Sequence, residues 1–310
     1  MKFAAIFLRL IRWPNLLFII ITQVLFYRIF FPFVYLVSGG DFAGVKLKTE
    51  LFYLLVVASI MIAAAGYIIN DYFDIQIDNI NRPGSLIIGN SITPKVALVL
   101  YSLFSVIGLL LSGYLSKQLQ NAYILFFNFI SVLVLLLYSY TFKRKLLIGN
   151  LIISALTAWV ILVLAVAESG FSESNHTGWG LLLKFSMLYG GFAFIISFIR
   201  EIVKDMEDIN GDKAMGCTTM PIVWGIPHTK IFAGIWMIVL ILTISAGVVY
   251  LLRDGKWIGS FYGVIFIMVP LIIALRKLLK AINPKDFHNL STMIKVIMLT
   301  GILSMLFIWF

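Results

Sequence analysis

The chain has 310 residues, of which 61% are hydrophobic and only 12% are charged, and its formal net charge is +10. This composition excludes an ordinary soluble globular protein and is typical of a protein that crosses the membrane several times. The single cysteine, Cys217, excludes an internal disulfide, and three histidines far apart in the sequence argue against a zinc or haem site. In a membrane protein, an excess of Lys and Arg indicates cytoplasmic connections, so no nucleic-acid partner is predicted.

Apolar runs long enough to cross the roughly 30 Å hydrocarbon layer of a bilayer predict about nine transmembrane helices. They lie near residues 15–37, 51–69, 96–115, 119–142, 146–167, 180–199, 230–252, 257–275 and 290–310. The first run is long and follows Arg9 and Arg12, which predicts a first span and not a cleaved signal peptide. The runs lack the alternation of membrane barrels. We therefore predict an all-α polytopic membrane protein, a helix bundle surrounded by membrane lipids, with residues 1–310 as a single domain.

The distribution of basic residues predicts the orientation in the membrane. With a cytoplasmic N-terminus, the other side receives only Lys46, Lys48, Lys117, Lys184, Arg253 and Lys256, whereas most Lys and Arg residues fall on the cytoplasmic side. The positive-inside rule then places the N-terminus in the cytoplasm and the C-terminus outside. The two longest cytoplasmic connections, near residues 70–95 and 200–229, are both rich in Asp.

The first acidic motif (residues 70–78) directly follows the second apolar run. If the helix continues, Asn70, Asp74 and Asp78 are four residues apart and share one face, with Asp71 adjacent. Like charges at this spacing repel each other, so carboxylates here require a cation. Asn81-Arg82-Pro83-Gly84-Ser85 is expected to end that helix.

The second acidic motif (residues 205–212) follows the sixth apolar run. Asp205, Asp208 and Asp212 are three and four residues apart, again on one helical face. Lys143, Arg144 and Lys145 follow the fourth run, where anchoring by the positive-inside rule and phosphate binding remain alternatives. Arg12 has the same two alternatives.

The two acidic motifs together predict a magnesium and diphosphate site. Hard carboxylate and amide oxygens without His or Cys suit Mg²⁺, which is usually held by one or two carboxylates with substrate phosphate oxygens and water. We expect the two motifs to face each other and to share Mg²⁺ ions with a diphosphate. Loss of a diphosphate from an allylic carbon needs metals and cations to stabilise the charge that develops, and shielding of the carbocation from water.

At this point the sequence resembles the UbiA superfamily of intramembrane prenyltransferases over nearly its whole length. The resemblance rests on both acidic motifs, on Asn81-Arg82-Pro83, on the Arg12-Trp13-Pro14-Asn15 element, and on Tyr138 and Lys143 with Asn150. It implies nine helices with two Asp-rich cytoplasmic loops and Mg²⁺-dependent transfer of a polyprenyl group from a diphosphate to a lipophilic acceptor. The amino-acid sequence at residues 70–74 and 200–205 is most similar to that of geranylgeranylglyceryl phosphate geranylgeranyltransferases. This points to isoprenoid lipid biosynthesis.

The resemblance also assigns roles to individual residues. Metal binding is expected of Asn70, Asp71, Asp74, Asp78, Asp205, Asp208 and Asp212. Direct participation in catalysis is expected of Asp74, Asp78, Asp208, Asp212 and Lys143. Substrate binding is expected of Arg12, Asn15, Arg82, Tyr138, Lys143, Asn150 and Lys204.

Three other functions remain open from the sequence. The acceptor can be a quinone precursor or another aromatic compound, and a terpene cyclase would ionise the diphosphate without any acceptor. A cation-coupled transporter would use the carboxylates as an ion path, but transport favours ionisable groups near the middle of the membrane, and the apolar runs contain almost none.

Overall fold

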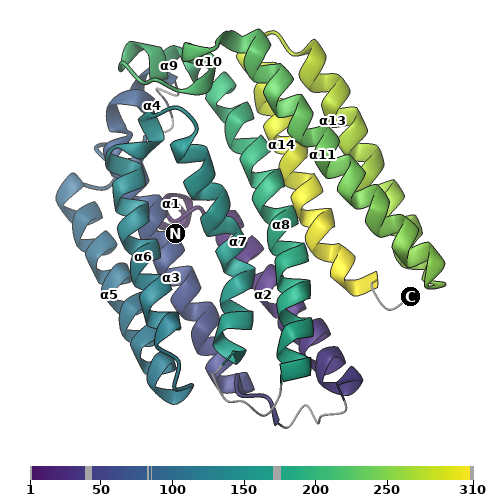
Figure 1. Ribbon diagram of the computed structural model, residues 1–310. Coiled ribbons are helices and arrows are strands. Elements are labelled where there is room, and N and C mark those ends of the chain that lie inside the picture. Colours follow the sequence, from purple (N-terminus) through teal and green to yellow (C-terminus); the bar gives the residue numbers. More distant parts are fainter. Residues whose placement is uncertain (1, 39–43, 82–83, 85, 170–175, 308–310) are drawn as a thin grey trace. The chain divides into compact units, whose positions relative to one another are not determined.

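The computed structural model describes residues 2–38, 44–81, 84, 86–169 and 176–307, and the elements within these ranges are helical (Figure 1). The chain divides into two compact units. Unit 1 comprises Met1–Lys143 and Trp159–Met187, and unit 2 comprises Arg144–Ala158 and Leu188–Phe310. A single domain over residues 1–310 stays a prediction.

Unit 1 is built mainly from long apolar helices. Its elements are α1 (Lys2–Leu10), α2 (Trp13–Val37), α3 (Thr49–Phe73), α4 (Ile75–Asn81), α5 (Pro94–Gln118) and α6 (Ala122–Tyr140), with parts of α7 (Ile148–Glu168) and α8 (His176–Glu207). Helix α3 packs against α5 and α6, and these three helices run side by side in Figure 1. Polar side chains join helices within this unit, because buried donors and acceptors need partners. Asn128 Nδ2 donates to Ser112 Oγ at 2.8 Å, and Trp159 Nε1 donates to Asn128 Oδ1 at 3.0 Å.

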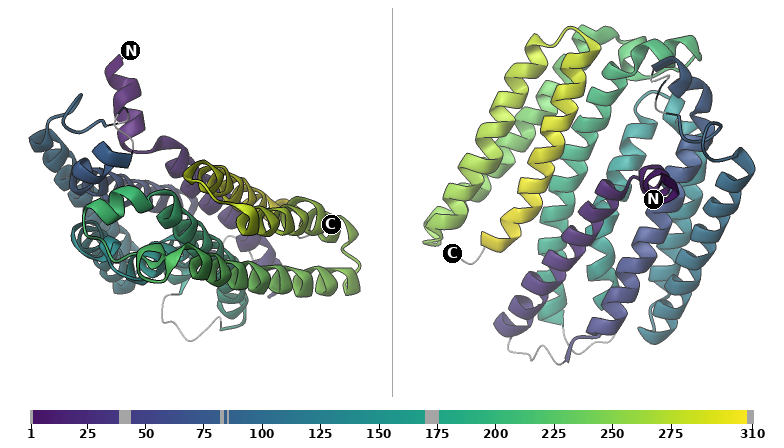
Figure 2. Two further views of the ribbon diagram at one scale, coloured as in Figure 1. Left: turned by 90° about the horizontal axis from the view of Figure 1, so that it is seen from above. Right: turned by 180° about the vertical axis from the view of Figure 1, so that it is seen from behind.

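The short helix α1 lies at an angle to α2 (Figure 2). Leu10 joins a small apolar cluster with Ile68 of α3 and Ala97 of α5, which holds α1 against the end of α3. The turn between α1 and α2 is at Arg12, whose φ of 50° lies in the left-handed region. This backbone geometry places a charged side chain beside the first acidic motif.

Unit 2 contains the rest of α7 and α8 and the helices that follow. These are α9 (Ile209–Ala214), α10 (Met220–Val223), α11 (Gly225–Arg253), α12 (Trp257–Tyr262), the π-helical η3 (Gly263–Met268), α13 (Val269–Lys280) and α14 (Pro284–Leu303). Helices α11, α13 and α14 pack together around a core that includes Met237, Leu271 and Ile294. Lys230 Nζ donates to the carbonyl oxygens of Leu279 and Ala281, near the end of α13.

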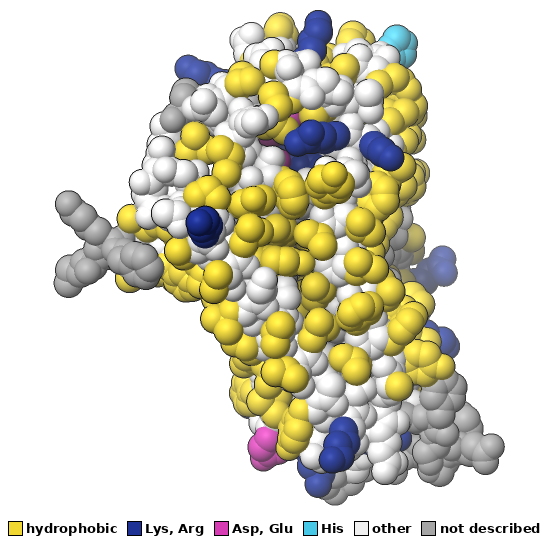
Figure 3. Space-filling view, turned by 90° about the vertical axis from the view of Figure 1, so that its left-hand side faces the viewer, with side chains coloured by type: hydrophobic (Ala, Val, Ile, Leu, Met, Phe, Trp, Pro, Cys, Tyr) yellow, Lys and Arg dark blue, Asp and Glu magenta, His cyan; other side chains and the backbone are white. Residues whose placement is uncertain are grey.

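Among the described residues, nine helical stretches are long and apolar enough to cross a membrane, as predicted. They are Trp13–Val37, Thr49–Phe73, Pro94–Gln118, Ala122–Tyr140, Ile148–Glu168, Gly178–Glu207, Gly225–Arg253, Trp257–Lys280 and Pro284–Phe307. Exposed hydrophobic residues such as Val99, Val106 and Leu110 run along α5. Figure 3 shows one face on which hydrophobic side chains fill the middle. An integral membrane protein explains this surface, because lipid tails replace the missing protein contacts.

The acidic motifs differ from the expectation of two Asp-rich loops, because most of their residues are helical. Helix α3 continues through Asn70 and Asp71, and α8 continues through Asp205 to Glu207, so Arg200 and Lys204 also lie within a candidate span. Charged residues lower the hydropathy of these helix ends, so the predicted apolar runs stop before the helices do. A backbone within a membrane still needs helical hydrogen bonds, whatever side chains it carries.

Candidate active site

The first acidic motif is a helix with one break. Helix α3 ends at Phe73, Asp74 lies at the break, and α4 begins at Ile75. The backbone N–H of Asp74 still donates to Asn70 O at 3.0 Å, and that of Asp78 donates to Asp74 O at 2.8 Å. The four-residue spacing of Asn70, Asp74 and Asp78 therefore survives the break. The expected continuous helix is interrupted only locally.

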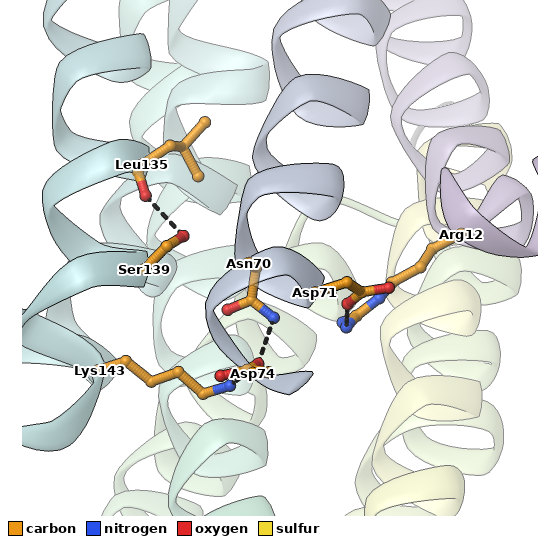
Figure 4. A network of polar contacts seen from close by, with 7 residues as sticks. All are labelled: Arg12, Asn70, Asp71, Asp74, Leu135, Ser139 and Lys143. Carbon is orange, nitrogen blue, oxygen red and sulfur yellow. Dashed lines mark hydrogen bonds and ion pairs between the residues drawn. The ribbon is translucent and has the colours of Figure 1, made fainter. Parts of the chain in front are cut away.

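The Asp74 carboxylate is the centre of this motif (Figure 4). It is 4% exposed, accepts a 2.8 Å hydrogen bond from Asn70 Nδ2, and forms an ion pair with the Lys143 ammonium. Lys143 lies in the 3₁₀ turn η2 (Phe142–Arg144) after α6, 69 residues along the chain. The side-chain oxygen of Asn70, Oδ1, is buried and has no hydrogen-bond partner among the described residues.

A second cation pairs with Asp71. The Nη2 atom of Arg12 lies 2.5 Å from Asp71 Oδ1, and the Arg12 guanidinium lies 5.3 Å from the centre of the Tyr67 ring. In Figure 4 the two ion pairs lie on either side of the end of α3. Asp71, which was expected to be a metal ligand, therefore forms an ion pair with Arg12, which was expected to bind substrate.

Burial and neighbouring charges set the protonation of this cluster. Burial alone lowers the pKa of Lys143, but the Asp74 carboxylate more than offsets it and raises that pKa above its ordinary value. The pKa of Arg12 is raised in the same way, burial opposing and Asp71 prevailing. Burial raises the pKa of Asp78, and the negative charge of Asp74 raises it further. Both cations are therefore fully charged at neutral pH.

The second acidic motif has the same construction in unit 2. Helix α8 ends at Glu207, Asp208 lies at the break, and α9 begins at Ile209. The backbone N–H of Asp208 donates to Lys204 O at 2.9 Å, and that of Asp212 donates to Asp208 O at 3.2 Å. Helical spacing is again retained, and the Asp212 side chain is buried.

Neighbouring segments of unit 2 fix this motif. Asn150 Nδ2 of α7 donates to Asp205 Oδ2 at 2.8 Å. The chain after α9 turns at Gly216, where φ is 69°, and Cys217 N then donates to Asp212 O at 2.9 Å. The backbone N–H and hydroxyl of Thr218 both donate to Arg144 O, at 2.8 and 3.0 Å. Asn150 and the segment after α9 therefore hold both ends of the motif.

Two polar pairs beside the second motif were not assigned from the sequence. His288 Nδ1 of α14 lies 2.9 Å from Glu207 Oε1, and Arg200 Nη1 lies 3.0 Å from Glu201 Oε1. Ionisable residues inside a membrane span mark functional positions, but residues 200–229 were assigned to a connection, so the sequence did not single out Arg200 and Glu201 in this way.

The remaining expected residues are less informative. Asn15 lies in the first turn of α2, and Tyr138 is buried in α6, where it acts electrostatically on Lys143. Arg82 lies outside the described residues. The expectation that the two motifs face each other stays a prediction, since they belong to different units.

The donor set of the first motif fits Mg²⁺. Among the described residues no three His, Cys, Asp or Glu side chains are grouped so as to hold a metal on their own. Mg²⁺ does not need such a cage, because substrate phosphates and water complete its octahedron. The buried Asn70 Oδ1 without a partner and the adjacent Asp74 carboxylate are hard oxygen ligands of the required kind.

Comparison with known proteins identifies the family of this sequence. The model of the UbiA prenyltransferase family matches residues 16–300. A relative from Thermococcus sibiricus named digeranylgeranylglyceryl phosphate synthase is 33% identical over 270 residues, which cover 84% of this chain and 85% of that protein.

Solved structures show the same fold. A structure described as giving insights into digeranylgeranylglyceryl phosphate synthase in membranes has a TM-score of 0.67 and 26% identity, and covers 98% of both chains. A UbiA homologue from Archaeoglobus fulgidus bound to GPP and Mg²⁺ has a TM-score of 0.59 at 13% identity, covering 97% of this chain and 99% of the other. The second likeness concerns the fold alone.

Proposed function

We propose that this chain, which belongs to the UbiA prenyltransferase family, transfers a polyprenyl group from its diphosphate to geranylgeranylglyceryl phosphate. The family supplies the reaction type, and the name of the Thermococcus sibiricus relative supports the acceptor. The observation that carries the proposal is the pairing of a buried and a partly buried carboxylate with basic side chains at the end of an apolar span, Asp74 with Lys143 and Asp71 with Arg12. Such a cluster suits a lipid whose diphosphate lies at the membrane boundary while its apolar chain lies among the helices.

We propose that Mg²⁺ is held by Asn70, Asp74 and Asp78 of the first motif and by Asp205, Asp208 and Asp212 of the second. When bound, the ion neutralises charge that develops on the leaving diphosphate. The Asn70 Oδ1 atom without a partner supports this role. The A. fulgidus homologue bound to GPP and Mg²⁺ supports the choice of ion.

The basic residues act on the same leaving group. As the allylic C–O bond breaks, its electron pair stays with the diphosphate, and the fixed charges of Lys143 and Arg12 stabilise the growing negative charge. The acceptor hydroxyl oxygen then forms the new C–O bond and releases its proton to water. The apolar helix surfaces near the site keep water away from the allylic carbon until the acceptor reacts.

The test uses purified full-length protein in lipid nanodiscs with a prenyl diphosphate, Mg²⁺ and geranylgeranylglyceryl phosphate. We expect diphosphate and a prenylated lipid product, detected by mass spectrometry, to form in equal amounts. EDTA should abolish turnover and added Mg²⁺ should restore it. Full activity after removal of divalent metal would contradict the metal assignment.

Omission or exchange of the acceptor separates this function from the alternatives. Diphosphate release without an acceptor, together with a cyclised hydrocarbon, would indicate a terpene cyclase. Product formation only with an aromatic acceptor would indicate a quinone-precursor prenyltransferase, and ion flux without diphosphate release would indicate a transporter.

A further inference from the structure

Arg200 is a cation inside a membrane span that none of the roles above uses. It belongs to α8, in the candidate span Gly178–Glu207. Its side chain is 24% exposed, and the adjacent Ile199 and neighbouring Val203 belong to the apolar core of unit 2. Charged side chains at such positions are costly and usually serve a substrate or ion.

The hydrogen bonding of Arg200 is incomplete. Its Nη1 atom lies 3.0 Å from Oε1 of Glu201, whose side chain is 13% exposed. Its Nε atom is buried and has no hydrogen-bond partner among the described residues. A buried charged donor without an acceptor is unfavourable, and an anionic oxygen is the partner that best satisfies a guanidinium.

A second cation lies on the same side of the helix. Lys204 follows Arg200 by four residues, so the two side chains lie on the same helical face. Two like charges at this spacing repel each other, and a bound anion removes the repulsion. Arg200 precedes Asp205 by five residues, about 7.5 Å along the axis, and α8 leads directly into α9, which carries Asp212, the last residue of the second acidic motif (Figure 1).

We propose that Arg200 determines acceptor specificity by binding the phosphate of the acceptor lipid, with Lys204 beside it. This inference rests on the proposed function and adds a residue for the second substrate. The donor diphosphate has its own cations in Lys143 and Arg12, which pair with the carboxylates of the first motif. Arg200 lies outside both acidic motifs, on the side that leads into the membrane, where a lipid phosphate with an attached apolar chain would reach it.

The test combines a change in the protein with a change in the substrate. In Arg200→Gln we expect KM for geranylgeranylglyceryl phosphate to rise roughly ten- to a hundred-fold, the effect of losing a charged hydrogen bond. KM for the prenyl diphosphate should stay within about twofold of wild type. With geranylgeranylglycerol, which lacks the phosphate, wild type and variant should react at the same rate, because the lost interaction is absent from both. Arg200→Lys should recover only part of the loss, since an ammonium lacks the planar fork.

The matched control is Arg276→Gln, which removes an exposed Arg from α13 of the same unit. It should leave both KM values unchanged. Thermal denaturation of each variant with and without the prenyl diphosphate checks folding, and Arg200→Lys retains the buried charge if Arg200→Gln folds poorly.

Three results would overturn the inference. One is a rise in KM for the prenyl diphosphate, which would assign Arg200 to the donor, and another is unchanged kinetics for both substrates. The third is an equal loss with both acceptors. Binding of the two acceptor lipids to wild type and variants, measured by calorimetry without turnover, separates this inference from the proposed function. Phosphate-dependent binding that requires Arg200 supports the inference even if the transferred group or the product differs from the proposal.

Discussion

The contact between Lys143 and Asp74 joins a buried carboxylate of the first motif to a residue 69 positions away in the sequence. The sequence predicted Lys143 as a phosphate ligand but left anchoring as an equal alternative. An anchoring lysine would not need an ion pair with a carboxylate that is 4% exposed. The pairing therefore favours a role of Lys143 in the site.

Lys143→Ala should lower the turnover number by about a hundred- to a thousand-fold, the scale seen when one charge-stabilising donor is lost. Lys143→Arg should retain part of the activity, because the charge remains while its reach and shape change. The measurement is the initial rate of diphosphate release at saturating substrate and Mg²⁺.

Lys95→Ala is the control for this variant. Lys95 is exposed in the first turn of α5, and its loss also removes one basic residue from the side predicted to be cytoplasmic. It should leave turnover within about twofold of wild type, since no substrate contact is expected there. If both variants insert normally and lose activity equally, the basic residues form a general electrostatic patch and Lys143 is no specific ligand.

Asp78 gives the pH prediction at the residue scale. Its pKa is raised in the folded protein, first by burial and then by Asp74, so the folded state holds this proton more tightly than the unfolded state. The stability contributed by Asp78 is therefore fully present below its unfolded pKa of about 3.9 and is lost as pH rises through the higher folded value. Asp78→Asn removes the ionisable carboxyl group, so the variant does not lose stability in this way as pH rises. It should raise the melting temperature at pH 7 in metal-free buffer while lowering activity.

The pH dependence itself is the check on this assignment. Measured at pH 4, the gain in melting temperature from Asp78→Asn should be smaller than at pH 7, because the wild-type carboxyl is then largely protonated. A gain that is constant over this range would show that the charge of Asp78 is not its cause.

At the scale of elements, hydropathy predicted the number of spans because a helix must satisfy its own backbone hydrogen bonds in lipid. The ends of the helices were less predictable. Residues 200–207 were placed in a connection because they are charged, yet they continue α8. The breaks at Asp74 and Asp208 have no signal of their own, because no Gly or Pro lies at either position.

Close packing of α3 on α5 provides a prediction at this scale. A Cβ atom at Gly108 would lie 2.8 Å from Ile62 Cγ1 and 3.4 Å from Ala58 O, so the Ile62 side chain or one of the two helices would have to shift. Overpacking costs about 1–3 kcal/mol, and the better helix propensity of Ala returns up to about 1 kcal/mol. Gly108→Ala should therefore lower the stability of the protein by roughly 1–2 kcal/mol, seen as a lower melting temperature in detergent.

Gly113→Ala in the same helix is the matched control. A Cβ at Gly113 meets nothing within 4 Å, so this change should be neutral or slightly stabilising. Equal destabilisation by the two variants would mean that the close approach of α3 and α5 is not the reason that Gly108 is required.

At the scale of the whole molecule, the residue types of the site were predictable and their partners were not. The spacing of Asp and Asn identified both motifs because helical periodicity is a local property. The pairing of Arg12 with Asp71 depends on a left-handed turn at residue 12 and on α1 packing against α3, which no local pattern encodes. Similarly, no local pattern indicated that the amide of Asn150 donates to Asp205, and the expected role of Asn150 in substrate binding stays a prediction.

Kinetics can test whether both acidic motifs act on one diphosphate. Asp74→Asn and Asp208→Asn should each remove most activity. If the two residues serve one site, the double variant should lose far less than the product of the two single losses. Asp254→Asn, which changes an exposed carboxylate after α11, is the control and should retain activity. Multiplicative losses in the double variant would indicate two separate sites.

The orientation in the membrane is the last prediction, and the two ends of α5 test it. Lys95 and Lys117 are both exposed and lie near opposite ends of this 25-residue span. With the N-terminus in the cytoplasm, Lys95 lies inside and Lys117 outside. In a Cys217→Ala background, a membrane-impermeant maleimide added to intact cells should label Lys117→Cys at once, and Lys95→Cys only after permeabilisation. Lys213→Cys, at an exposed position of α9 next to Asp212 of the second motif, should behave like Lys95→Cys, because the site is predicted to face the cytoplasm. The reverse pattern would invert the topology and place both acidic motifs outside, while labelling of all three positions in intact cells would mean that α5 does not separate two compartments.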